Sequence, residues 1–318
     1  MKRFSFVGVL AVLFAGPALG QGFPSRDVRF INGFPAGGTS DIIGRLLAEQ
    51  FSKQLGKTVV VDNKAGASGM IAAAETAKSA PDGHTILLAS MAMMTVLPQM
   101  VKTSIDVDKD LTTIGNVASV YNILVVGRDT PYQSWQDVAK AAKANPEKVS
   151  CATVGSGSSQ QLSCALFMAL TGTRLTQVPY RGGAPAIVDM IGGRVDLMFG
   201  NMPEFLGQIG GKNLIPIAFG SPRQSPMFPD LPLISQFVPG YSVVNWFAVF
   251  GSRGLPADLT DVWNKALRAA VAKADVQKRF FDNGMDTIIG SPVDLKATIV
   301  ADRKKWAEVI QEAGMRAD

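Results

Sequence analysis

Apolar positions follow two alternating patterns along this chain. Short runs rich in Val, Ile and Leu predict strands, and longer segments with apolar residues every three or four positions predict helices. The clearest helix spans 40–55 and ends at Gly56. Its apolar face consists of Ile42, Ile43, Leu46, Leu47, Phe51 and Leu55. Strands separated by helical crossovers predict parallel sheets and an α/β fold.

The same patterns predict elements along the remaining chain. Strands are predicted at 28–31, 58–61, 84–89, 149–154, 177–179, 195–199, 214–219 and 241–250. Helices are predicted at 40–55, 68–79, 135–144, 160–170, 184–191, 258–274 and 292–313.

Two long apolar stretches predict how the chain divides into domains. The stretch 114–126 is long enough to pass from one α/β unit to another, and the stretch 241–250 returns. We therefore predict a first lobe from residues 21–121 plus 239–318 and a second from residues 122–238. Two chain crossings between lobes suit hinge closure around a ligand.

The first 20 residues carry the features of a secretory signal peptide. Lys2 and Arg3 precede an apolar stretch, and Ala18-Leu19-Gly20 provides a small-residue cleavage site. The stretch is shorter than the roughly 20 apolar residues that span a bilayer. We expect an exported, periplasmic protein cleaved near Gly20.

Composition excludes several function classes. Without the signal peptide, 29 basic and 26 acidic residues are spread evenly, which gives little support to nucleic-acid binding. One histidine, His84, and no clustered ligands argue against a metal site. Cys151 and Cys164 either form a disulfide, which an exporting compartment permits, or remain as two buried thiols.

Three glycine-rich loops share one design, since each follows a predicted strand and precedes a predicted helix. They are Phe34-Pro-Ala-Gly-Gly38, Gly155-Ser-Gly-Ser-Ser159 and Tyr180-Arg-Gly-Gly183. In open α/β sheets such loops line the ligand crevice, and helix N-termini bind anions. The alternative is that each loop only turns the chain. Arg181 either anchors an acidic ligand or forms a surface salt bridge.

Known phosphate and hydrolase motifs do not fit these loops. Gly155-Ser156-Gly157 is followed by Gln160 where the dinucleotide fingerprint has its third glycine. The serines lack a Gly-x-Ser-x-Gly elbow and a plausible base, so we expect neither an enzyme nor a cofactor. A secreted hydrolase remains the weakest alternative. The methionine-rich segment 90–94 either lines an adaptable pocket wall or packs in the core.

Several ordered motifs resemble the Bug-type (TctC-like) receptors of tripartite tricarboxylate transporters, from Pro24 to nearly the C-terminus. They are Phe34-Pro-Ala-Gly-Gly-x-x-Asp41, Ala80-Pro-Asp-Gly83, Val178-Pro-Tyr-Arg-Gly-Gly-Ala-Pro185 and Gly192-Gly-Arg-Val-Asp-Leu-Met-Phe199. The resemblance implies a two-lobed type II periplasmic binding fold that closes on a small carboxylate. In the family the first loop and the Gly-Ser loop hold the carboxylate through backbone groups and bridging waters.

The loops and the resemblance together give the candidate ligand-binding residues. They are Phe34, Ala36, Gly37, Gly38, Asp41, Ser90, Ala92, Met93, Ser156, Gly157, Ser158, Gln161, Tyr180, Arg181, Gly182, Gly183 and Asn201. The implied partners are a carboxylate and the membrane permease subunits, with the receptor a monomer. The alternative is a periplasmic sensor with the same cleft.

The chain departs from the family pattern at three places. Asn32-Gly33 replaces a common Val-Pro, and Gln161 replaces a common His. Gly200 stands where an Asp often precedes Asn201, which removes a natural partner for a ligand ammonium group. We therefore expect a ligand without an amine, such as a di- or tricarboxylate or an aromatic acid.

Overall fold

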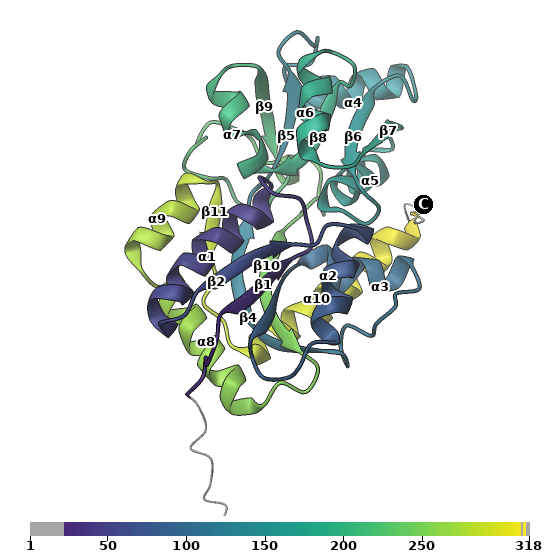
Figure 1. Cartoon of the computed structure of the whole chain (residues 1–318). Coiled ribbons are helices and arrows are strands. Elements are labelled where there is room, and N and C mark those ends of the chain that lie inside the picture. The colour runs from purple at the N-terminus through teal and green to yellow at the C-terminus, as the bar shows by residue number, and fades with distance from the viewer. Residues whose placement is uncertain (1–21, 313, 316–318) are drawn as a thin grey trace, which may run out of the picture.

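A computed structural model of the chain describes residues 22–312, 314 and 315. The predicted signal peptide at 1–20 lies outside the described residues. Figure 1 shows two α/β lobes, one above the other, with the strand labels of each sheet in a different lobe. The chain therefore has the predicted two-lobed α/β architecture.

The sheet of the first lobe has the strand order β11-β4-β10-β3-β1-β2. Its parallel part pairs β1 with β2 and β3, while β10 runs antiparallel to β3 and β4. The strands are β1 (Val28–Asn32), β2 (Val59–Asn63), β3 (Thr85–Ser90), β4 (Leu111–Val120), β10 (Asn245–Ser252) and β11 (Met285–Thr287).

The sheet of the second lobe has the order β7-β6-β8-β5-β9. Strand β6 runs parallel to β7 and β8, and β5 runs antiparallel to β8 and β9. The strands are β5 (Asn122–Gly127), β6 (Ser150–Val154), β7 (Thr176–Tyr180), β8 (Leu197–Asn201) and β9 (Leu214–Phe219).

Helices cover both faces of the first sheet. Apolar residues of α1 and α8 pack in one core cluster, and those of α2 and α10 pack in another. The helical segments of this lobe are α1 (Thr39–Leu55), η1 (Ala67–Gly69), α2 (Met70–Ala77), η2 (Ala92–Val96), α3 (Leu97–Met100), α8 (Ala257–Val271), α9 (Ala274–Asp282) and α10 (Pro292–Glu312). Those beside the second sheet are α4 (Trp135–Ala144), α5 (Ser159–Thr171), α6 (Gly183–Ile191), α7 (Met202–Gly210) and η3 (Ile234–Gln236).

Tyr121 is the single residue between β4 of one sheet and β5 of the other. Its N–H donates to Gly284 O at 3.4 Å, and its carbonyl accepts from Met202 N at 2.8 Å. Its hydroxyl donates to Asp286 Oδ2 at 2.8 Å. Burial and this hydrogen bond raise the pKa of Tyr121 to about 12. The proposed lobe boundary at 121/122 falls at this residue, and the second one, at 238/239, falls in the connection from β9 back to β10.

The structure corrects several predicted elements. The apolar stretch 114–126 is two strands, and the helix predicted at 258–274 ends at Val271, with α9 beginning at Ala274. Helix α7 was not predicted, because Pro203, Gly207 and Gly210 read as breakers. Proline is tolerated in a first helical turn, whose N–H groups have no intrahelical acceptor.

Cys151 and Cys164 are free thiols in the structure, which corresponds to the second of the two sequence-based alternatives. Cys151 on β6 and Cys164 on α5 are both fully buried and in hydrogen-bond contact with each other. Burial raises the pKa of the Cys164 thiol well above its usual range. Both side chains therefore act as small core residues.

Within the described residues, no helix is both long and apolar enough to cross a membrane. Over the same part of the chain, no group of His, Cys, Asp or Glu side chains is arranged to hold a metal ion.

Candidate ligand-binding site

A cavity of about 430 Å³ lies between the two lobes. Its wall is formed by the loop before α1, the end of β3 and the first residues of α5, α6 and α7. Eleven of the predicted residues line it: Phe34, Ala36, Gly37, Gly38, Ser90, Ala92, Ser158, Arg181, Gly182, Gly183 and Asn201. The structure thus brings parts of all three predicted loops together.

Asp41 holds the first loop in shape and does not line the cavity. Its Oδ2 accepts the Gly37 N–H at 2.9 Å and Arg45 Nε at 2.9 Å, and its Oδ1 accepts Asn63 Nδ2 at 3.1 Å. Burial opposes the charge, but these hydrogen bonds outweigh it and lower the pKa of Asp41. Asn63 also donates to Phe34 O at 3.2 Å, which ties the loop to β2.

Gln161 likewise holds the Gly-Ser loop, residues 155–159, in shape. Its Oε1 accepts the Gly157 N–H at 2.7 Å, and its own N–H donates to Ser158 Oγ at 3.2 Å, which caps α5. Gly155 and Gly157 have φ of 71° and 72°, a region that favours glycine. Gln161 and Gly157 therefore shape the loop from outside the cavity.

The other predicted residues outside the cavity have different roles. Tyr180 donates its hydroxyl to Asp189 at 2.9 Å. Met93 is fully buried and packs beneath Gly69, where an added Cβ would lie 2.6 Å from its sulfur. The Ser156 carbonyl accepts Ser68 Oγ at 3.0 Å.

Three helices begin at the cavity without a side-chain cap. The N-cap residues are Gly38 for α1, Gly182 for α6 and Asn201 for α7, and each lines the cavity. The N-termini of α1 and α6 present backbone N–H groups and partial positive charge, which favour an anion, whereas at α7 the Met202 N–H donates to Tyr121 O and Pro203 has no N–H. Arg181, also in the wall, adds a full positive charge.

Two buried polar atoms of residues beside the cavity have no hydrogen-bond partner in the part of the chain that the structure describes. They are Ser90 Oγ and Asn245 Oδ1, on side chains that are only 4% and 3% exposed. Most buried polar groups are paired, so each unpaired atom calls for a bound group or water. Both atoms have almost no exposed surface, so they lie just behind the cavity wall.

Glu204 is a charged residue of the cavity wall that the sequence reasoning missed. It projects from the first turn of α7 into the cavity wall and accepts from Thr39 Oγ1 at 3.2 Å, Gln160 Nε2 at 3.2 Å and Asn201 Nδ2 at 3.2 Å. Burial raises the pKa of Glu204 above its usual value, against these hydrogen bonds.

The cavity therefore contains an acid despite the glycine at position 200. A Cβ at Gly200 would lie 3.3 Å from Glu204 Oε2 and 2.7 Å from the Phe205 ring. The missing side chain leaves space for the Phe205 ring and, less closely, for the Glu204 carboxylate. The expectation of a ligand without an amine rested on Gly200 alone and stays a prediction, since Glu204 supplies another acid to the same wall.

Other unpredicted lining residues follow the predicted loops directly. Thr39, Ser40, Ser159 and Gln160 are the first residues of α1 and α5, so extending each loop into its helix would have found them. Asn245 opens β10 and is brought in by the antiparallel pairing with β3 and β4, which the sequence pattern does not encode.

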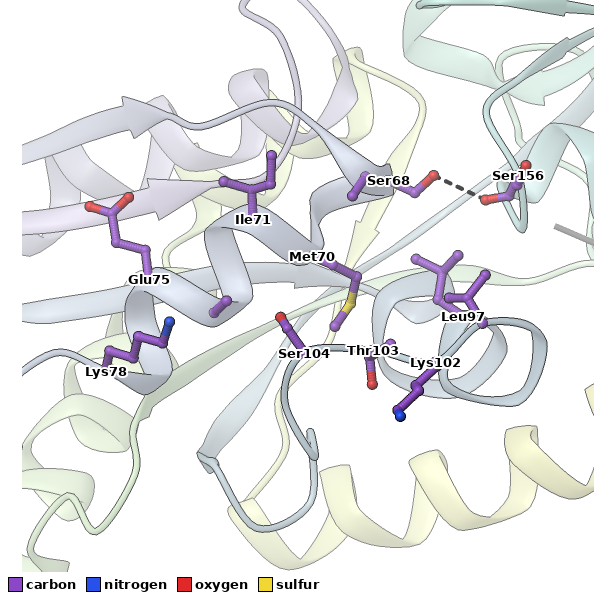
Figure 2. A pocket seen from close by; sticks show the side chains of 13 residues that line it. Ser68, Met70, Ile71, Glu75, Lys78, Leu97, Lys102, Thr103, Ser104 and Ser156 are labelled. Atoms are coloured by element: carbon purple, nitrogen blue, oxygen red, sulfur yellow. Dashed lines mark hydrogen bonds between the residues drawn. The ribbon is translucent and has the colours of Figure 1, made fainter. Parts of the chain in front are cut away.

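A second cavity, of about 660 Å³, lies beside the first and is shown in Figure 2. Its wall comes almost entirely from α2, α3 and residues 101–104, with exposed Lys78 and Lys102 at its rim. Of the described residues of the second lobe, Ser156 alone reaches it, at the end of the hydrogen bond from Ser68 drawn in Figure 2. The predicted loops converge on the smaller cavity.

Comparisons with known proteins identify the family of this chain. The family model described as the tripartite tricarboxylate transporter family receptor matches residues 43–315. The chain belongs to this family. Its members are periplasmic binding receptors and not enzymes.

Individual relatives cover nearly the whole chain. Protein BugT of Bordetella pertussis is 32% identical over 305 residues, which is 95% of this chain and 94% of BugT. The structure of R. palustris Rpa4515 with adipate has a TM-score of 0.89 and 31% identity, covering 92% of this chain and 99% of that one. MatC (Rpa3494) from Rhodopseudomonas palustris with bound malate has a TM-score of 0.84 and 26% identity, covering 91% and 100%.

Proposed function

We propose that this receptor captures a small carboxylated ligand in the interlobe cavity and delivers it to the membrane permease subunits of a tripartite tricarboxylate-type transporter. The observation that carries the proposal is the pair of uncapped helix N-termini, those of α1 and α6, at one cavity, with Arg181 beside them. Bound adipate and malate in two structural relatives support a carboxylate.

The proposed mechanism is closure of the lobes on the ligand. The Asp41 and Gln161 hydrogen bonds fix the loops before binding, so little conformational entropy is lost when a carboxylate docks. Interlobe contacts then favour the closed form, and the ligand shifts the population towards it. The permease subunits would recognise that closed form.

Thermal unfolding of the purified protein against a panel of carboxylates tests the binding step. A ligand at about 100 times its Kd should add about 2.7 kcal/mol of stability. Arg181→Ala should weaken the response, whereas Arg174→Ala, which removes an exposed arginine paired with Glu147 at 3.5 Å, should leave it unchanged. A panel without any stabilising carboxylate would refute the proposal.

Delivery needs its own test. Labelled ligand should enter vesicles that contain the permease subunits only when the loaded receptor is added. Uptake that is independent of the receptor would refute delivery while leaving ligand capture intact. Export is tested by N-terminal sequencing of the periplasmic protein, which should begin at Gln21, immediately after the proposed cleavage site.

A further inference from the structure

Glu204, Asn201 and Asn245 form a connected set of polar side chains in the cavity wall, called here the acceptor cluster. Asn245 Nδ2 donates to Asn201 Oδ1 at 3.1 Å, and Asn201 Nδ2 donates to Glu204 Oε1 at 3.2 Å. All three residues line the interlobe cavity. They come from β10, β8 and α7, so both lobes contribute.

The chemistry of the carboxylate orients the whole cluster. Thr39, Gln160 and Asn201 all donate to the Glu204 carboxylate, so the Asn201 amide nitrogen faces Glu204. The Asn201 oxygen then faces Asn245, which must donate to it. Asn245 Oδ1 is then left without a partner among the described residues and, with almost no exposed surface, lies behind the cavity wall. A ligand group beside the cluster therefore meets the Glu204 carboxylate as its acceptor.

We infer that the cavity selects a carboxylate that also carries a hydrogen-bond donor, a hydroxyl or an ammonium group, bound by the acceptor cluster. The inference rests on the proposed function and narrows its ligand class. A second carboxylate in the same place would meet the Glu204 carboxylate, and two carboxylates this close cannot both be ionised without a cost. A donor group pairs with the Glu204 carboxylate instead.

The position of the Glu204 carboxylate is fixed by packing as well as by hydrogen bonds. Thr39 Oγ1 approaches it from α1 of the first lobe and Gln160 Nε2 from α5 of the second. The absent side chain at Gly200 leaves space for the Phe205 ring and, less closely, for this carboxylate. Burial raises its pKa, so a ligand donor that stabilises the charged form would offset that burial.

Calorimetry with matched ligands tests the inference. Succinate, malate and aspartate share one carbon skeleton and carry a hydrogen, a hydroxyl or an ammonium at one carbon. Glutarate, 2-hydroxyglutarate and glutamate repeat the set on a longer skeleton. In the set that binds, at least one donor-bearing compound should bind about tenfold more tightly than the unsubstituted acid, or about 1.4 kcal/mol. The hydroxyl and ammonium compounds distinguish the two donors.

Glu204→Gln removes the charge and retains the shape of the side chain. The variant should reduce the preference to about threefold or less, chiefly by binding the unsubstituted acid more tightly. Glu308→Gln, the same change at an exposed position of α10, should retain the full preference. The order of ligand affinities is measured on the wild-type protein. The inference can therefore still be tested if Glu204→Gln fails to fold.

The outcomes separate this inference from the proposed function. Equal binding of the unsubstituted acid and both analogues by the wild type would overturn the inference alone. A preference that survives in Glu204→Gln would overturn it as well. Failure of every carboxylate to bind would overturn the proposed function, and the inference with it.

Discussion

The backbone N–H of Gly37 donates to the Asp41 carboxylate at 2.9 Å, four residues further along the chain. Gly157 and Gln161 repeat this relation in the other lobe at 2.7 Å. In both places a side chain in the first turn of a helix binds back to the glycine loop that precedes the helix. Both loops at the interlobe cavity therefore have a fixed conformation before a ligand binds.

Asp41→Ala should weaken ligand binding about tenfold, because it leaves the Gly37 N–H and Asn63 Nδ2 without their acceptor and loosens the loop. Calorimetry measures the change. Arg45→Ala is the matched control, since it removes only the exposed partner of Asp41 and should change affinity little. Equal losses in the two variants would contradict this role for Asp41.

Asp41 also predicts a pH dependence of stability. Its folded-state pKa lies below the ordinary value of 3.8, so its stabilising effect is present above that value and is lost as the pH falls below it. Asp41→Asn should therefore cost most at neutral pH and progressively less below about pH 4. Urea unfolding of both proteins between pH 7 and 3 measures this. A cost that is constant with pH would contradict the prediction.

Gly157→Ala should impair closure of the lobes. The added Cβ would lie 3.0 Å from Leu97 Cδ2 of the first lobe and demands a left-handed backbone at φ of 72°. Gly172→Ala carries similar backbone strain at φ of 63° with no atom within 4 Å of its Cβ. Both variants should lose about 1 kcal/mol of stability, and only Gly157→Ala should also lose ligand affinity. Unfolding and calorimetry distinguish these effects.

Ser68→Ala should speed ligand release. Ser68 has φ of 49° within a run of positive φ from Gly66 to Gly69, and it spans the lobes through Ser156 O. One such hydrogen bond contributes about 1 kcal/mol, equivalent to about a fivefold faster dissociation in stopped-flow measurements. Ser79→Ala, whose hydroxyl bonds only Glu75 O of the same lobe, is the control. An unchanged rate in Ser68→Ala would exclude a role in closure.

The two cysteines should be inaccessible in the folded protein. Cys151 and Cys164 have no exposed surface, so a reagent reaches neither sulfur, and burial also raises the pKa of the Cys164 thiol. A thiol reagent should label neither residue in native buffer and both in denaturant without reductant. No labelling in denaturant would mean that they are bridged after all.

The sequence predicted the glycine-rich loops better than it predicted which side chains line the cavity between them. Strand–glycine–helix corners such as Phe34–Gly38 are local features, and the α/β architecture brings them to one edge. Asp41, Gln161 and Tyr180 were placed in the right region but given a contact with ligand, because sequence spacing cannot distinguish a side chain that faces the cavity from one that holds the loop.

Glu204 shows the limit of sequence reasoning more sharply. Its helix was obscured by Pro203 and nearby glycines, and its place beside Thr39 depends on how two lobes far apart in sequence meet. Gly200 gave no sign of this neighbouring acid, because a missing side chain does not show which neighbour takes the space. Asn245 depends likewise on an antiparallel strand that returns late in the chain.

The hydrogen bond from Met202 N to Tyr121 O, at 2.8 Å, joins the first residue of α7 to the residue that separates β4 from β5. Glu204 lies only two positions beyond that attachment. Evolutionary substitutions in α7 that alter ligand preference are therefore expected to shift the resting angle between the lobes. Ligand preference and basal opening would then evolve together, and a receptor redesigned for a new ligand would need its hinge adjusted as well.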